Sequence, residues 1–301
     1  MPPARRHQRH RFISSAFLRR AAAELASEYE SQGFVVIPRL LSKHAVRRLQ
    51  AAASRVLRQR CRRVPPAWIL GLHQKNQPRH EAWVMSIAAD PAVCRLLAAA
   101  LGGTPVLLSS QLFVKMPASA VGSIDNMSGQ EIPWHQDASG AGRTLTLWIA
   151  LDDIDPAGSN GGLMVLPGLH RQGLFPTKIC NAAFATFDEI DMAKVDFQPE
   201  KAVRYSFSAG GAGLHGPYTP HSSAANLSER PRRVLVLRYC TPASSLVKGE
   251  ALFDLHGEVM QSGTDTRHQI LCWSTGELID RQAVLCSQDC DTGGRDILCE
   301  A

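Results

Sequence analysis

The sequence predicts a mainly β fold with N-terminal helices: a jelly roll, or cupin-like double-stranded β-helix, that is braced by helices. Two observations lead to this prediction. Before residue 103 the apolar residues recur at helical spacing between capping residues, and from Val106 onward they alternate with polar residues as they do in strands. A helical layer followed by about eight short strands is typical of this fold class.

The first helix is expected to begin at Ser14 and Ser15, which can cap it, and to end at Gly33, before a short strand over residues 34–37. A second helix begins at Ser42 and has one apolar stripe, made of Val46, Leu49, Ala53, Val56 and Leu57. A third has Asp90 at its cap and Pro91 at its first position. These helices should cover one face of the sheet.

Alternation defines the faces of two later strands. On the strand that starts at Thr144, Thr146 and Trp148 lie on one face, opposite Leu145, Leu147 and Ile149. The run Val234 to Leu237 is also a strand. One of its faces has Arg232, Val234, Val236 and Arg238, and the other has Arg233, Leu235, Leu237 and Tyr239. The strand that starts at Thr144 therefore has one aliphatic face and one face with polar residues, and the later strand places Arg232 and Arg233 on opposite faces.

The 301 residues are expected to form one domain over residues 26–241, with residues 242–301 as a C-terminal extension packed on it. Residues 1–25 are expected to be a disordered basic tail. Its six arginines account for the whole net charge of +6, because the other 27 basic residues of the chain are matched by its 27 acidic residues. The neutral body argues against a nucleic-acid partner, because a basic patch would be expected around the working site. The alternative for the tail is an organelle transit segment.

Compartment and redox state follow from two absences. The chain has no apolar stretch long enough to cross a bilayer and no apolar core of a secretory signal, so we expect a soluble, cytoplasmic protein without a membrane partner. Its eight cysteines are then expected to be reduced thiols. None has the paired spacing of a structural zinc site.

The segment Trp134-His135-Gln136-Asp137 is the first half of a predicted metal site. Residues two apart on an extended strand face the same side, so His135 and Asp137 can bind one ion together. A second histidine from a distant strand, His221, would complete two imidazoles and one carboxylate, the ligand set of non-haem iron(II) enzymes that leave three positions open. Alone, a His-x-Asp pair is more often a surface polar pair.

An arginine follows the second histidine at a useful distance. Several enzymes of this kind fill two open iron positions with 2-oxoglutarate, whose far carboxylate needs a permanently charged, two-pronged partner. Arg232 lies eleven residues beyond His221, far enough for the chain to turn and return alongside. We choose Arg232 over Arg233 for this role.

These motifs together resemble the phytanoyl-CoA dioxygenase family of iron(II)/2-oxoglutarate-dependent oxygenases. The resemblance covers residues 26–241 and rests on residues 33–38 (GFVVIP), 113–115 (FVK), 134–137 (WHQD), 147–154 (LWIALDDI), 160–170 (NGGLMVLPGLH) and 221–233. It implies that His135, Asp137 and His221 bind iron, that Arg232 and Ser223 hold the distal carboxylate of 2-oxoglutarate, and that Trp148 and Gln111 line its pocket. The chain departs from the family at Leu169, where serine is usual.

An extra histidine, His215, is a rival for the distal iron ligand. Only His221 has the serine and asparagine that follow at the family's spacing. We therefore expect His215 to be a hydrogen-bonded histidine near the pocket.

The resemblance implies a dioxygenase that uses iron(II), 2-oxoglutarate and dioxygen, with ascorbate as reductant in vitro, to hydroxylate an unactivated C–H bond. Asp137 favours hydroxylation over chlorination, because related halogenases replace this acid by a small residue. The expected substrate is a small molecule such as an acyl thioester, an amino-acid derivative or a secondary metabolite. Its selection is assigned to two predicted irregular loops, residues 118–132 and 171–204.

Two questions about function stay open at this point. An acidic group on the substrate is one expectation, with Lys115, Arg143 and Arg238 as candidates to bind it. The alternatives to a small-molecule hydroxylase are a nucleic-acid or protein-directed demethylase or hydroxylase of the same chemistry, and a non-catalytic metal-binding jelly-roll module, which could hold zinc.

Overall fold

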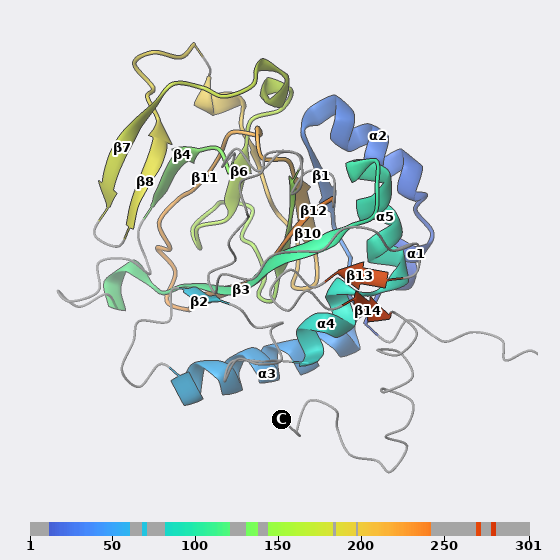
Figure 1. Ribbon diagram of the computed structural model, residues 1–301. Helices are drawn as coiled ribbons and strands as arrows, with labels where there is room; N and C mark the ends of the chain where they lie inside the picture. The colour runs from blue at the N-terminus through green and yellow to red at the C-terminus, as the bar shows by residue number, and fades with distance from the viewer. Residues whose placement is uncertain are drawn as a thin grey trace, which may run out of the picture.

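Two antiparallel sheets face each other, and helices cover the outer side of the larger sheet (Figure 1). The computed structural model describes residues 12–60, 68–70, 82–120, 131–137, 144–182, 185–196, 198–241, 269–271 and 278–280. Its helices are α1 (Ser15–Leu18), α2 (Ala22–Gln32), α3 (Lys43–Arg60), α4 (Ala82–Ala88) and α5 (Pro91–Leu101), with short 3-10 turns at Ala118–Ala120, Leu169–Gln172 and Pro199–Lys201. The predicted fold class is confirmed.

The larger sheet has the order β1-β10-β5-β12-β3-β2, made of Phe34–Ile37, Ala212–His215, Thr144–Ala150, Arg232–Cys240, Val106–Lys115 and Trp68–Leu70. The smaller sheet has the order β4-β11-β6-β9, made of Ile132–His135, His221–Ser223, Leu163–Val165 and Val203–Arg204. Strands far apart in sequence are neighbours in both sheets. Such non-local pairing is typical of a jelly roll.

The predicted strand faces are confirmed by two separate cores. Leu147, Leu235 and Leu237 pack with the helices on the outer side of the larger sheet. Trp148 and Val236 belong to a second apolar cluster, which lies between the two sheets together with Leu163 and Val165 of β6. Alternation along β5 and β12 thus separates the helix-covered face from the face that lines the interior.

The capping predictions hold at three helix ends. Ser14 Oγ accepts a hydrogen bond from Phe17 N at 3.0 Å, and Asp90 accepts one from Ala92 N at 2.8 Å. Gly33 follows α2 with a φ of 84°, a conformation that favours glycine. The expected single helix is divided into α1 and α2, however. Backbone hydrogen bonds join residues 12–14 to residues 40–42 and fix the position at which α1 begins. The chain turns after α1, and α2 then packs against α5.

The boundary of the basic tail was predicted too late in the chain. Phe12, Ile13, Phe17 and Leu25 are all buried in the larger core, so at least residues 12–25 belong to the folded unit. Residues 1–11, which contain four of the six tail arginines, lie outside the described residues. The missed signal is the apolar pair Phe12-Ile13 within the basic stretch.

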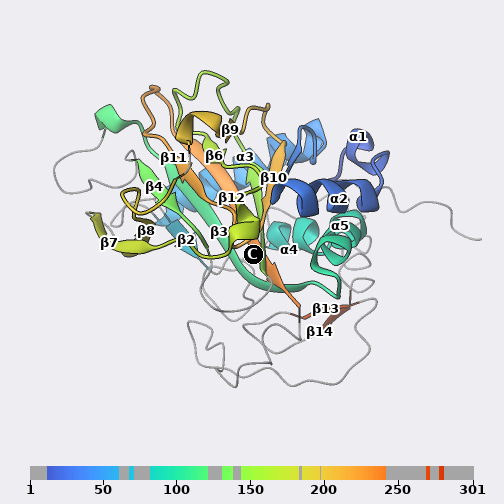
Figure 2. The same ribbon diagram turned by 90° about the horizontal axis from the view of Figure 1, so that it is seen from above.

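One of the two predicted irregular loops contains regular structure. Residues 171–204 contain a hairpin of β7 (Thr177–Ala182) and β8 (Ala185–Ile190), where an irregular loop was predicted. Figures 1 and 2 show this hairpin beside β4, on the side away from α2 and α5. Of residues 118–132, the part from 121 to 130 lies outside the described residues. In the C-terminal extension, β13 (Gln269–Leu271) pairs with β14 (Leu278–Asp280).

Two further predictions concern the part of the chain that the structure describes. Cys94 and Cys240 are buried free thiols, as expected for reduced cysteines, while the other six cysteines fall on positions whose side chains are not described. No helix within the described ranges has both the length and the apolar character needed to span a membrane.

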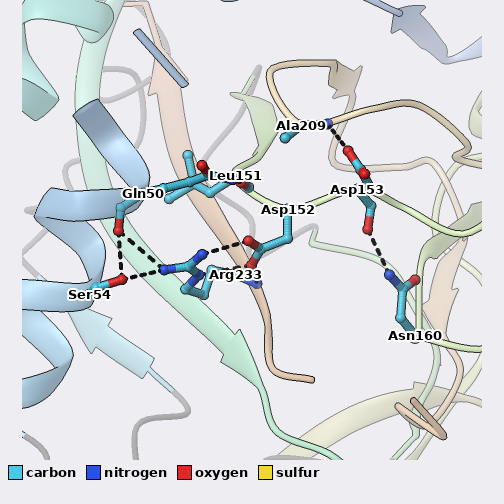
Figure 3. A network of polar contacts seen from close by, with 8 residues as sticks. All are labelled: Gln50, Ser54, Leu151, Asp152, Asp153, Asn160, Ala209 and Arg233. Atoms are coloured by element: carbon cyan, nitrogen blue, oxygen red, sulfur yellow. Dashed lines mark hydrogen bonds and ion pairs between the residues drawn. The ribbon is translucent and has the colours of Figure 1, made fainter. Parts of the chain in front are cut away.

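Arg233 connects the larger sheet to α3 (Figure 3). Its Nε and Nη2 donate to the two carboxylate oxygens of Asp152 at 2.8 and 2.6 Å, and its Nη1 donates to Ser54 Oγ at 2.7 Å. Gln50 of α3 also donates to Leu151 O at 2.7 Å. These bonds fix α3 across the outer face of the sheet.

Replacing Arg233 by alanine should lower the free energy of unfolding by about 2 kcal/mol, because hydrogen bonds to charged groups are lost and Asp152 keeps no paired cation. Urea unfolding followed by circular dichroism measures this change. Arg39→Ala, which removes an exposed side chain, is the control. Equal stability of the two variants would contradict the structural role.

Candidate active site

The candidate site is a cavity of about 240 Å³ between the two sheets. The larger sheet contributes residues from β3, β5, β10 and β12, and the smaller sheet contributes residues from β4, β6 and β11. The predicted metal ligands and the residues predicted to hold 2-oxoglutarate both line this cavity. The cavity walls include His135, Asp137, His221, Arg232, Trp148 and Gln111.

The three predicted metal ligands come together in this cavity. His135 is the last residue of β4, and it pairs in register with His221, the first residue of β11. Asp137 lies two residues past His135, just beyond the strand end. The nearest ligand atoms of the three side chains all lie within 4.8 Å of one another, so one ion can contact all of them.

Gln136 lies between the two ligands and holds the adjacent loops. Its Nε2 donates to Gly173 O at 2.8 Å and to Tyr218 O at 2.7 Å, and its Oε1 accepts from Phe175 N at 2.8 Å. Because these partners lie outside the ligand cluster, Gln136 faces away from His135 and Asp137, as predicted.

Backbone carbonyls orient both histidine rings. His135 Nδ1 lies 2.8 Å from Pro133 O, and His221 Nδ1 lies 2.9 Å from Thr219 O. A carbonyl only accepts, so each Nδ1 must donate and each neutral ring keeps its lone pair on Nε2. Burial lowers the pKa of both imidazoles to about 4, which keeps them neutral and able to bind a metal at physiological pH.

The Asp137 carboxylate is ionised despite its burial. Desolvation alone would raise its pKa, but Arg238 and the neighbouring histidines hold that pKa well below its usual value. Arg238 Nη2 lies 3.4 Å from Oδ1, and Thr146 Oγ1 donates to Oδ2 at 3.1 Å. Two neutral imidazoles and one carboxylate therefore form a donor set that fits iron(II).

Arg232 and Arg233 lie on opposite faces of β12, and they differ in their partners. Arg232 is only 1% exposed and lines the cavity, with its guanidinium carbon 5.5 Å from the Phe113 ring centroid and 5.3 Å from that of Trp148. Its Nε and Nη1 have no hydrogen-bond partner among the described residues. Arg233 lies outside the cavity and is fully engaged with Asp152 and α3.

Burial lowers the pKa of the Arg232 guanidinium to about 9, which still leaves it charged near neutral pH. A buried cation with unused donors is costly unless an anion pairs with it. Unused N–H donors on a buried cation suit an anionic ligand such as a carboxylate. This end of the cavity therefore fits the distal carboxylate of 2-oxoglutarate.

Contrary to the prediction from sequence, Lys115 does not lie where it could bind an acidic group of the substrate. It is buried beside Ser223, where its Nζ donates to Ser223 Oγ at 2.7 Å, to Ser223 O at 3.0 Å and to Ala224 O. Burial, and next the charge of Arg232, lower its pKa well below the usual value. With all three N–H bonds used inside the protein, Lys115 is not available to an acidic substrate.

The other predicted residues lie as follows. Trp148, Gln111 and Ser223 line the cavity, but the Ser223 hydroxyl already donates to Gly161 O at 2.9 Å. Arg238 lies in the cavity wall and faces Asp137. Arg143 lies outside the described residues.

His215 is buried in the cavity wall, yet its predicted hydrogen bond is not found. Neither ring nitrogen has a hydrogen-bond partner among the described residues. Its Nε2 lies 3.9 Å from Asp137 Oδ2, and its ring is 4.6 Å from that of His221, measured between centroids. It is not part of the three-residue ligand cluster.

Sequence reasoning missed Thr146, whose only signal was its position on the same strand face as Trp148.

Comparison with known proteins agrees with this geometry. The family described as Phytanoyl-CoA dioxygenase (PhyH) matches residues 29–234. No curated protein sequence matches the chain.

Several solved structures have the same fold. The apo form of ThoJ, a non-heme monooxygenase, is 25% identical, and the match covers 72% of this chain and 77% of that chain with a TM-score of 0.57. EvdO2 from Micromonospora carbonacea var. aurantiaca, complexed with 2-oxoglutarate, is 24% identical over 72% of this chain and 89% of that chain, with a TM-score of 0.55. The epimerase SnoN, in complex with Fe3+, alpha ketoglutarate and nogalamycin RO, is 20% identical over 80% of this chain and 96% of that chain, with a TM-score of 0.58.

Proposed function

The chain belongs to the phytanoyl-CoA dioxygenase family of iron(II)/2-oxoglutarate-dependent enzymes, and on that premise we propose that it hydroxylates an unactivated C–H bond of a small molecule. The single observation that supports this best is the buried Arg232 guanidinium, two of whose nitrogens have no hydrogen-bond partner among the described residues. It lines the same cavity as the cluster of His135, Asp137 and His221. A metal-binding cluster alone would also suit a structural ion. A buried cation beside it needs an anionic ligand.

In this proposal His135, Asp137 and His221 would hold iron(II) through two Nε2 atoms and one carboxylate oxygen. With only three protein ligands, the ion would keep positions for the co-substrate and dioxygen. Arg232 pairs with the distal carboxylate of 2-oxoglutarate, and Trp148 and Gln111 line the space around that co-substrate. Ser223 borders the same end through its hydroxyl oxygen, which Lys115 orients.

Iron(II) and 2-oxoglutarate, when bound, supply the oxidising chemistry: dioxygen and the keto acid give succinate and carbon dioxide, and the second oxygen atom enters the substrate C–H bond as a hydroxyl group. The protein's own part is to hold the components and exclude water. Phe113, Leu163 and Val236 form apolar walls around the ligand cluster. Such walls limit side reactions of an uncoupled oxidant with solvent.

Two features favour hydroxylation of a small molecule. Asp137 occupies the position that a chloride ion would need in a halogenase. The cavity of about 240 Å³ is below the usual size of a drug-like site, so it suits 2-oxoglutarate together with the reacting end of a substrate. Acyl thioesters, amino-acid derivatives and secondary metabolites all fit this description. An anionic group on the substrate would bind at Arg238, the only one of its three candidate residues that lines the cavity among the described residues.

A substrate screen tests the proposal. The purified protein with iron(II), ascorbate and 2-oxoglutarate should release succinate slowly alone and faster with a true substrate, whose product should gain one oxygen atom by mass spectrometry. An epimerised product without added oxygen, as the relative SnoN's description as an epimerase illustrates, would refute hydroxylation. Absence of succinate with every substrate class and alone would refute the enzyme assignment.

A further inference from the structure

Three polar residues form a row across the larger sheet, opposite the metal-binding cluster. His215 on β10 pairs with Thr146 on β5, and Thr146 pairs with Arg238 on β12. Directly paired residues on neighbouring strands face the same side of a sheet. All three line the cavity. We call His215, Thr146 and Arg238 the carboxylate row.

Each member of the carboxylate row lies next to Asp137. Thr146 Oγ1 donates to Oδ2 at 3.1 Å, and Arg238 Nη2 lies 3.4 Å from Oδ1 and 3.5 Å from Oδ2. His215 Nε2 is 3.9 Å from Oδ2, just beyond hydrogen-bonding distance, and has no other hydrogen-bond partner among the described residues. A small rotation of either side chain would complete that bond.

Asp137 needs such support more than the two histidines do. Each histidine lies in a paired strand and has its ring held by a backbone carbonyl two residues before it. Asp137 lies beyond the end of β4, and the side chains that contact its carboxylate among the described residues, Thr146, Arg238 and His215, all come from the opposite sheet. A carboxylate also rotates freely about its last side-chain bond, because that torsion has broad minima.

We propose that the carboxylate row positions Asp137 for metal binding, a role that rests on the proposed iron site. Thr146 holds Oδ2 from the side of the larger sheet, His215 lies beside Oδ2 where a small rotation brings it into hydrogen-bonding distance, and Arg238 lies against both oxygens. The carboxylate plane is thereby fixed with respect to His135 and His221. Arg238 has five N–H donors, so it can contact Asp137 and a substrate anion at the same time. Thr146, His215 and Arg238 are positioning residues: they act on the ion through Asp137.

Cobalt(II) titration of the full-length metal-free protein, followed by visible absorbance, tests the proposal without turnover. Thr146→Val, which keeps the side-chain shape and removes the hydroxyl, should weaken cobalt(II) binding by about tenfold, the lower end of what loss of a ligand's hydrogen-bond partner costs. Thr146→Ser should restore most of that loss. His215→Leu should weaken binding by a similar factor.

Two comparisons separate positioning from general stability and from the metal site itself. Thr144→Val changes the same residue type two positions earlier on the same face of β5 and should bind cobalt(II) like wild type. Metal-free Thr146→Val should melt at the wild-type temperature. His135→Ala should bind no cobalt(II) at this site. Wild-type affinity in both Thr146→Val and His215→Leu, with loss in His135→Ala, would overturn the carboxylate row and leave the metal site intact. Wild-type affinity in His135→Ala would overturn the metal site itself.

Discussion

Replacing His135 by alanine is expected to abolish succinate formation from 2-oxoglutarate. The variant keeps only two protein ligands for iron(II), and we expect two ligands to bind the ion too weakly for it to stay in the site during the assay. His135 is also held in place by Pro133 O, so its Nε2 is oriented before any ion binds. We expect a loss of at least about 1,000-fold, down to the background of the assay.

His44→Ala is the matched control for that variant, since His44 is exposed on α3 and lies outside the cavity. Succinate measured over time, with iron(II) and ascorbate constant, should be the same for His44→Ala and wild type. A His135→Ala variant that is as active as this control would show that the reaction does not use the proposed iron site.

Replacing Arg232 by alanine should weaken 2-oxoglutarate binding by about 100-fold, because truncating one partner of a buried, hydrogen-bonded charge pair costs about 3 kcal/mol. Calorimetric titration in the presence of zinc(II), which permits binding without turnover, measures the change. Arg233→Ala should bind 2-oxoglutarate almost as wild type does, since its guanidinium is engaged with Asp152 outside the cavity. The reverse ranking would show that Arg233 holds the co-substrate.

The same residue allows a prediction about stability in the absence of the co-substrate. Arg232→Met replaces a buried cation, two of whose nitrogens have no hydrogen-bond partner in the described part of the chain, by an apolar side chain of similar length. Such replacements are often neutral or stabilising. We expect the metal-free Arg232→Met protein to melt at or above the wild-type temperature, although it binds 2-oxoglutarate poorly. A fall of several degrees would mean that Arg232 has a structural role in addition to its role at the site.

The parts of the site that depend on local geometry could be predicted from sequence. Strand alternation has a fixed period of two, so Arg232 and Arg233 had to face opposite sides once residues 232–240 were recognised as a strand. The same period brought His135 and Asp137 to one side. Helix caps at Ser14 and Asp90 also depend only on neighbouring residues.

Contacts between distant strands could not be predicted in this way. Thr146 and His215 face Asp137 because of the register among β5, β10 and β12, which joins residues many positions apart. Lys115 and Ser223 are 108 residues apart in the sequence, yet they form a hydrogen bond. This contact explains why Lys115, which was expected to bind substrate, instead binds to the protein itself. The β7–β8 hairpin was missed because its pairing uses backbone bonds and leaves Ile179 exposed, so it has no regular apolar pattern.

A crystal structure of the wild-type protein grown without oxygen, in the presence of iron(II) and 2-oxoglutarate, tests the central claim most directly. The account predicts one ion bound by Nε2 of His135, Nε2 of His221 and an oxygen of Asp137, with the keto acid on two further positions and its distal carboxylate on Arg232. An ion enclosed by four protein ligands with no vacancy, or a keto acid bound away from Arg232, would contradict it.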